Sequence, residues 1–343
     1  MYKNLPTIEV MILTYNRSEL FEKTFRSVCN QTYNDLTIKV FNNGSIDNTE
    51  DVFFKVKNEY SNRKIEYLKL EENHLDDYYL EKRNEILTAD YCIIFHDDDL
   101  MHPRYVEYLM KVINEHPEVV LLGGKTNISS HLENIPWCEP EGKYILGNTC
   151  DLTKWYIRGD TFSFPSICYK TEILKKLKSR EDLYGNRLDF PFVAEVSKYG
   201  PICELKDRFI HYRTHGNNDF YNLPTMEQRI NLINKFASIL LAGDNECREI
   251  FYDRIYRECS DFRFIDYKTA KEHGWISKKT DKKLKREFSF PYLYFKYILY
   301  GIIANIVYKF SKNQKLRKKY AKKHLKYRNK IKKAEKYYTL YQK

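Results

Sequence analysis

The sequence lacks several patterns that would point to common classes of protein. Its eight cysteines form no Cys-x-x-Cys pair and no zinc-binding spacing, which excludes a zinc module and a dithiol redox motif. Several of them lie in apolar runs, which is typical of thiols buried in a core. The first residues, 1–6, contain no apolar segment, so we expect no signal peptide and a cytoplasmic protein. There is also no internal repeat.

Charge and hydropathy describe a folded chain with an unusual end. Of the 343 residues, 43% are hydrophobic and 31% are charged, which favours a packed core and excludes general disorder. The length suits one large domain or two moderate ones. The formal net charge is +11, and most of the excess lies after about Lys278. The C-terminal end therefore differs in character from the rest.

The first third of the chain alternates between the patterns of strands and helices. Short apolar runs, each followed by a turn, predict strands, and apolar residues at spacings of three and four predict helices. This alternation favours an α/β fold with a parallel sheet covered by helices. The expected strands are 8–13, 36–41, 65–70, 91–95 and 119–122, and the expected helices lie around 18–28, 51–60, 79–87 and 103–116.

Three adjacent acids, Asp97, Asp98 and Asp99, follow the apolar run 91–95 directly. Adjacent carboxylates repel one another, and a divalent cation such as Mg²⁺ relieves that repulsion. The carboxyl ends of parallel strands are where such sheets bind ligands, so the pattern indicates a site for a metal and a diphosphate. The alternatives are a solvated acidic loop or a helix N-cap before Pro103.

Two further polar loops follow predicted strands. Residues 14–17 come after the first strand, where the backbone can meet a nucleotide and Tyr15 can lie against a base. Asn16 and Glu19 have the spacing of a capping box for the following helix. The turn 42–49 comes after the second strand. The sequence therefore predicts a ligand site at one edge of the sheet.

Four segments in order resemble family 2 glycosyltransferases, which are inverting enzymes of the GT-A fold. They are Ile12-Leu13-Thr14-Tyr15-Asn16-Arg17, Asn42-Asn43-Gly44-Ser45-Ile46-Asp47-Asn48-Thr49, Lys82-Arg83-Asn84 and His96-Asp97-Asp98-Asp99. The resemblance implies a Rossmann-like nucleotide-diphospho-sugar transferase fold with a helical, basic C-terminal extension. It also implies a nucleotide-diphosphate-sugar donor and Mn²⁺ or Mg²⁺ as cofactor. The chain departs from the family where Asn42 or Asn43 replaces an acid that contacts the nucleoside.

The resemblance also implies roles for individual residues. Asp97, Asp99 and His215 are expected to bind the metal, although the family pattern also fits a register centred on Asp98 with His96 in an acidic slot. His215 and Arg213 belong to the segment 211–218, which resembles the family's Tyr-Arg-x-His-x-x-Asn. The residues expected to contact the donor are Thr14, Tyr15, Asn16, Arg17, Asn42, Asn43, Arg83, Asp97, Asp98 and Arg213.

An inverting transfer needs a general base to deprotonate the acceptor hydroxyl. The family takes this base from a Glu-Asp pair about ninety residues beyond the metal site, and here Leu188 replaces the Glu. Asp189 is therefore the expected catalytic base. It could instead, or also, be the N-cap of the helix that follows. Glu195 is the reserve candidate.

The C-terminal tail, 288–343, combines an aromatic, apolar stretch with a dense run of Lys and Arg. Lys296 interrupts the apolar stretch, and its tyrosines suit a membrane interface better than a hydrocarbon interior. We expect a helix on the surface of an anionic membrane, at its inner face; the alternatives are a packed helix or a merely solvated charged face. The expected domains are 1–125 for the nucleotide-sugar, 126–223 for the acceptor and base, 224–287 as a helical region, and the tail.

The leading hypothesis is an inverting, metal-dependent glycosyltransferase. It would move a sugar from a nucleotide-diphosphate-sugar to a glycan or lipid-linked acceptor in cell-surface polysaccharide synthesis, with no nucleic acid partner. A nucleotidyltransferase is the second hypothesis, but the first strand is followed by no Gly-rich loop with Arg or Lys. A third hypothesis is a non-enzymatic protein that binds membrane or nucleic acid through its tail.

Overall fold

The computed structural model describes residues 5–74, 78–132, 135–159, 163–177, 181–184, 189–214, 225–261 and 265–341. The chain divides into two compact units, Met1–Gly243 and Asp244–Lys343. The N-terminal unit therefore extends twenty residues beyond the boundary at 223 that the sequence predicts.

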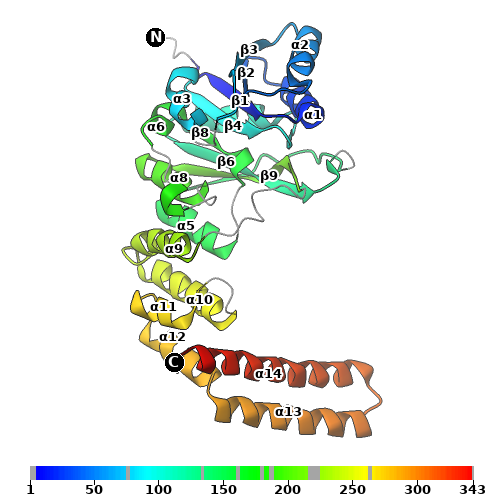
Figure 1. Cartoon of the computed structure of the whole chain (residues 1–343), viewed down its shortest axis with the longest axis vertical. Helices are drawn as coiled ribbons and strands as arrows, with labels where there is room; N and C mark the ends of the chain where they lie inside the picture. The colour runs from blue at the N-terminus through cyan, green and yellow to red at the C-terminus, as the bar shows by residue number, and fades with distance from the viewer. Residues whose placement is uncertain are drawn as a thin grey trace. The chain divides into compact units, whose positions relative to one another are not determined.

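A mixed sheet forms the centre of the N-terminal unit (Figure 1). Its described strands run in the order β3-β2-β1-β4-β8-β6-β9-β5, and β7 pairs with β9. The bounds are β1 Ile8–Thr14, β2 Leu36–Asn42, β3 Lys64–Lys69, β4 Tyr91–His96, β5 Leu100–Met101, β6 Leu121–Ser129, β7 Tyr144–Gly147, β8 Cys168–Lys170 and β9 Ile202–Arg213. The predicted α/β fold is confirmed.

The parallel half of the sheet, β3-β2-β1-β4, brings the predicted loops together. Thr14 at the end of β1 is level with Asn42 at the end of β2, and Leu13 is level with His96 at the end of β4. Because all these strands run the same way, the three polar loops leave the sheet at one edge.

Helices α1 (Ser18–Cys29) and α2 (Thr49–Glu59) pack on this half of the sheet, whereas Tyr105 and Tyr108 of α4 (Tyr105–Glu115) contact Phe209 of β9 in the other half. The predicted inward residues Phe21 and Phe25 of α1 are fully buried, and Phe25 stacks on Phe53 of α2 at 5.7 Å between ring centroids. Aromatic side chains bury more apolar area than other residues and dominate core energetics. They fix the helices that precede and follow the second strand.

The other half of the sheet departs from the predicted parallel order. The three-residue strand β8 lies antiparallel between β4 and β6, and the two-residue strand β5 pairs antiparallel with β9. Strands this short carry no periodicity, so the sequence gives no signal for them. Their effect is to place β9 beside the segment that follows the three acids.

The remaining helical segments of the N-terminal unit include α9, which marks its end. Asn231 of α9 donates a hydrogen bond to the carbonyl oxygen of Leu183, and Lys235 forms an ion pair with Glu195. These contacts explain why α9 belongs to this unit rather than to a later region. The bounds are α3 Tyr78–Ile86, α5 Thr149–Arg158, α6 Thr171–Leu174, α7 Glu181–Tyr184, α8 Asp189–Val196 and α9 Met226–Leu240, with 3-10 turns η2 Phe164–Ser166 and η3 Ser197–Tyr199.

The C-terminal unit is helical, as its sequence predicts. Its last two helices, α13 and α14, lie side by side as an antiparallel hairpin in which Tyr297 stacks on His324 and Tyr300 on Tyr327 (Figure 1). Among the described residues, no single helix has the length and hydropathy to cross a bilayer, although the bent pair 278–287 and 291–310 passes the same criterion together. The bounds are α10 Asn245–Asp261, α11 Tyr267–Glu272, α12 Lys278–Glu287, α13 Phe290–Phe310 and α14 Gln314–Tyr341.

Candidate functional site

The loops after β1 and β2 are tied together by Asn16. Its backbone lies in the left-handed region, with φ of 50°, which asparagine tolerates better than most residues. Its N–H donates to the Ser45 hydroxyl at 3.0 Å, and its side-chain oxygen accepts from the Ile46 N–H at 2.8 Å. The predicted capping box is wrong: the N-cap of α1 is Arg17, without a side-chain cap, because Asn16 binds the neighbouring loop instead.

Asn42 and Asn43 shape the second loop. The Asn42 oxygen accepts from the Ser45 N–H at 2.8 Å, and its amide donates to the Tyr67 hydroxyl at 2.8 Å. The Asn43 amide donates to the carbonyl oxygen of His74 and its oxygen accepts from the His74 N–H. Each of these amides both donates and accepts a hydrogen bond, which a carboxylate could not do, and the bonds fix the second loop. Contact with a nucleoside stays a prediction for both residues.

Asp97 faces the loop after β1. Its carboxylate accepts from the Tyr15 N–H at 3.2 Å and lies 3.2 Å from the Arg17 guanidinium, which also reaches Asp98 at 3.4 Å. Burial raises the pKa of Asp97, and the Arg17 charge opposes that rise. The predicted neighbours Tyr15, Arg17, Asp97 and Asp98 therefore do meet, and the Tyr15 side chain stays exposed beside them.

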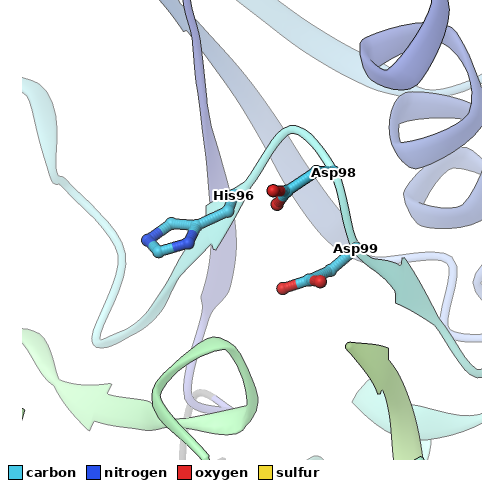
Figure 2. A group of neighbouring side chains, drawn as sticks. All are labelled: His96, Asp98 and Asp99. Atoms are coloured by element: carbon cyan, nitrogen blue, oxygen red, sulfur yellow. The ribbon is translucent and has the colours of Figure 1, made fainter. Parts of the chain in front are cut away.

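The side chains of His96, Asp98 and Asp99 converge at the same turn (Figure 2). One ligand atom from each of His96, Asp98 and Asp99 lies within 4.8 Å of the others. Asp99 is fully buried; one oxygen accepts from the Arg213 N–H at 2.8 Å, and the other has no hydrogen-bond partner among the described residues. Burial, with Asp98 adding to it, raises the pKa of Asp99 well above the ordinary range.

This group fits a divalent cation. A buried carboxylate oxygen without a partner is costly, and two carboxylates with one imidazole are ligands that a metal such as Mn²⁺ accepts. A bound cation would also favour the charged form of Asp99. Of the expected metal ligands, Asp99 belongs to this group together with Asp98 and His96. Asp97 instead accepts from the Tyr15 N–H and pairs with Arg17, and its binding of a metal stays a prediction.

Arg213 lies where the family resemblance predicts, at the end of β9 beside the acids. Its side chain donates to the carbonyl oxygen of Asp98 at 2.9 Å, in addition to the backbone bond to Asp99. The neighbouring His211 is level with Leu100 across β5 and β9, and its ring stacks on Trp137 at 3.5 Å. Burial and His102 lower the pKa of His211 to about 4. It is therefore neutral at pH 7.

The sequence predicts that Arg83 contacts the donor, but in the structure its guanidinium binds backbone carbonyl oxygens of the protein. Arg83 is buried, and its guanidinium donates to the carbonyl oxygens of Leu174, at 3.1 Å, and of Leu177. The ring of Phe192 lies 5.9 Å away. The described contacts connect α3 to the last residue of α6 and to Leu177 after it, which is a structural role. Contact with the donor stays a prediction, and the Arg83→Met variant discussed below tests it against this structural role.

The predicted catalytic residues are only partly described. Asp189 is the first residue of α8, but its side chain lies outside the described residues, as does the whole of His215. The reserve base, Glu195, forms ion pairs with Lys198 and Lys235. A carboxylate engaged with two lysines is a poorer proton acceptor, so Asp189 stays the first choice.

Comparison with known proteins identifies the family. The model named Glycosyl transferase family 2 matches residues 9–177, which include β1, β2, β4 and the acids. An abequosyltransferase, RfbV, of Salmonella typhimurium is 26% identical over 267 residues, covering 73% of this chain and 78% of the relative. A GalNAc(5)-diNAcBac-PP-undecaprenol beta-1,3-glucosyltransferase of Campylobacter jejuni is 24% identical over 327 residues, covering 90% and 97%.

Solved structures show the same fold. TarS of S. aureus, residues 1–349 in complex with UDP, superposes with a TM-score of 0.56 at 15% identity, covering 97% of this chain and 91% of TarS. A mannosyltransferase, PcManGT, of Pyrobaculum calidifontis in complex with GDP-Man and Mn²⁺ has a TM-score of 0.50 at 13% identity, covering 91% and 89%. With the loops at the ends of β1, β2 and β4 in the family's order, this GT-A chain belongs to glycosyl transferase family 2 and is a glycosyltransferase.

Proposed function

We propose that the enzyme transfers a sugar, with inversion, from a nucleotide-diphosphate-sugar to a hydroxyl of a glycan or lipid-linked acceptor, and that it requires a divalent cation. The observation that carries this proposal is the group of His96, Asp98 and Asp99 next to the Arg17 loop, in which one oxygen of the buried Asp99 has no hydrogen-bond partner among the residues that the structure describes. The ligands of TarS and PcManGT support a nucleotide-bound donor. The Campylobacter relative supports a lipid-linked acceptor in polysaccharide synthesis.

His96, Asp98 and Asp99 would hold Mn²⁺ or Mg²⁺, and the metal would offset the negative charge that develops on the departing diphosphate. Around it, Tyr15 and Arg17 would receive the nucleotide. Arg17 is 39% exposed at its side chain, so its guanidinium can turn from the carboxylates to a phosphate, with which it forms bidentate bonds. Asp97 keeps this loop in place through the Tyr15 N–H.

Asp189 would act as the general base. Its position at the start of α8 agrees with the family's placement of the base at the opening of a helix. In the reaction its carboxylate would take the proton of the acceptor hydroxyl while the hydroxyl oxygen attacks the anomeric carbon. The carbon–oxygen bond to the nucleotide diphosphate breaks on the opposite face, which inverts the configuration.

The test begins with donor and metal binding. Thermal unfolding is followed with UDP-, GDP-, CMP- and dTDP-sugars, each with and without MnCl₂. A ligand at 100 times its Kd stabilises the fold by about 2.7 kcal/mol, or roughly 5–10 °C for a unit of this size. We expect one nucleotide class to give such a shift and to need the metal. No shift with any donor would contradict the proposal.

Two variants then separate metal binding from chemistry. Asp98→Asn should lose the metal-dependent shift, whereas Glu118→Gln, which changes an exposed acid outside the group, should keep it. Asp189→Asn should keep the donor shift and lose transfer by a factor of about 10² or more, in line with general-base catalysis. A fully active Asp189→Asn enzyme would remove Asp189 from the mechanism.

We further propose that the enzyme works at the inner face of a membrane, where a lipid-linked acceptor would lie. The aromatic and basic character of the last two helices supports this location.

A further inference from the structure

The positive charge of the chain is confined to its C-terminal unit. Residues 244–343 contain 28 Lys and Arg against 11 Asp and Glu, a net charge of +17. The rest of the chain contains 30 against 36, a net charge of −6. A field of this strength attracts an anionic surface at long range and repels a second copy of the same unit.

Helix α13 presents a continuous apolar stripe to solvent. Its members are Phe295, Ile298, Ile302, Ile306 and Phe310, which are spaced by three or four residues and are each more than half exposed. Such spacing keeps the side chains on one face of the helix. Of the two charged residues of α13, Lys296 lies off this face, and Lys309, three residues after Ile306, lies at the C-terminal end of the stripe.

The opposite face of α13 is covered by α14. Gly301 allows this close approach, since a Cβ atom there would lie 3.0 Å from the His324 ring. Tyr297 and Tyr300 contact α14 on the same side. The contacts with α14 therefore use the side of α13 that the stripe leaves free, and the hairpin keeps an apolar outer face.

Helix α14 carries the charge. Between residues 315 and 336 it has twelve Lys and Arg and one acid. Exposed lysines recur on one of its faces at spacings typical of a helix: Lys315, Lys318, Lys319, Lys322 and Lys326. His324 and Tyr327 hold α14 against α13, and Lys322 and Lys326 lie two residues before and after His324, on the far side of α14. The hairpin therefore has its apolar stripe on one outer side and these lysines on the other.

We propose that this hairpin docks on an anionic lipid bilayer, with α13 parallel to the surface and its stripe in the interfacial region. The stripe supplies the apolar contact at the headgroup boundary, and the net charge of the C-terminal unit attracts it to anionic lipid. Lys296 and Lys309 can extend their ammonium groups toward the headgroups while their methylene groups lie along the apolar surface. The proposal names the binding element behind the membrane location proposed above.

Lipid fits these observations better than the other partners of a basic surface. A nucleic acid would use the lysines but gain nothing from exposed isoleucines, which need an apolar medium. A second copy would cover the stripe but bring two units of +17 together. An anionic bilayer offers the stripe an apolar medium and attracts the net charge of the unit.

The test uses the full chain and sedimentation with vesicles of phosphatidylcholine alone or mixed 7:3 with phosphatidylglycerol. The key variant is Ile302→Glu and its matched control is Leu325→Glu on α14. The residues at these two positions are 53% and 51% exposed, and each substitution lowers the net charge of the chain by one. Burying an Ile side chain in an apolar medium strengthens binding by a factor of about ten or more. We expect Ile302→Glu to weaken binding to the mixed vesicles by that factor, and Leu325→Glu by less than about threefold.

Several outcomes would overturn the proposal. These are equal loss in the two variants, no preference for the anionic vesicles, or binding that 0.5 M NaCl leaves unchanged. A dimer in sedimentation velocity that Ile302→Glu dissociates, without vesicle binding by either protein, would assign the stripe to self-association. Vesicle binding needs no donor or acceptor, so its failure would leave the sugar-transfer proposal intact.

Discussion

Gly44, in the turn after β2, offers the sharpest test of how the site is built. Its φ is +75°, and a Cβ atom there would lie 2.6 Å from both the Asn73 nitrogen and the Glu72 carbonyl oxygen. Residues 72–74 also hold Asn43 through His74. Gly44→Ala therefore pushes apart two backbone segments that fix the second loop of the site.

A substitution at Gly159 measures the cost of the left-handed backbone conformation apart from the cost of the steric overlap. Gly159 has nearly the same φ, +77°, at the C-cap of α5, but a Cβ atom there would meet no atom within 4 Å. An L-residue in the left-handed region costs about 1–2 kcal/mol, and this applies to both positions. Only Gly44→Ala adds an overlap of about 1 Å with backbone, which costs roughly another 1–3 kcal/mol by analogy with overpacked cores.

The difference is measurable by thermal unfolding. For a unit of this size, 1 kcal/mol lowers Tm by about 2–4 °C. Gly159→Ala should lower Tm by about 2–8 °C, and Gly44→Ala by roughly 2–12 °C more. Gly44→Ala should also weaken donor binding, because Ser45 holds Asn16. Equal Tm values for the two variants would refute the close approach of residues 44 and 72–73.

Two further predictions concern buried charges. Arg83→Met should lower Tm by several degrees and leave the donor KM within about twofold, because it removes charge-assisted bonds to the carbonyl oxygens of Leu174 and Leu177; a KM that rises tenfold at unchanged Tm would restore the predicted donor contact. For Asp99, burial raises the folded pKa, so the folded chain keeps a proton that the unfolded chain loses. With a chelator present, stability should therefore fall as pH rises from about 4 through the raised pKa and stay lower above it. Asp99→Asn should flatten the curve of Tm against pH, and an unchanged curve would show that Asp99 does not titrate in this way.

The parallel half of the sheet could be predicted from sequence because each of its elements carries its own signal. The run 91–95 is apolar and is followed by acids, and the structure has β4 at Tyr91–His96. The mixed half could not be predicted in the same way. Strand β8 has three residues and β5 has two, so their pairing is decided by tertiary contacts rather than by a pattern in the chain.

At the site, too, the sequence predicts which residues are neighbours but not the direction in which each side chain points. The sequence identifies the loop of Arg17 and the acids 97–99 as neighbours, which the ion pairs confirm. It does not decide which acid faces which partner, because three consecutive residues in a turn point in directions that the turn geometry sets. Arg83 shows the converse: the motif names the residue, but the carbonyl oxygens it binds belong to a segment about ninety residues later.

Arg213 explains why the proposed metal site depends on the mixed half of the sheet. Its N–H holds one oxygen of Asp99 and its side chain holds the Asp98 carbonyl oxygen, and both bonds span more than a hundred residues. They exist only because β5, directly after the acids, pairs with β9. The acids alone would repel one another at the tip of β4. The loop after β1 neutralises two of them through Arg17, and β9 orients the third so that one oxygen stays free. The same two bonds connect the acids to the strand that leads into the segment of His215. Asp99 therefore links the loops at the ends of the parallel strands to β9, and a change in β9 should alter metal affinity without touching a proposed ligand.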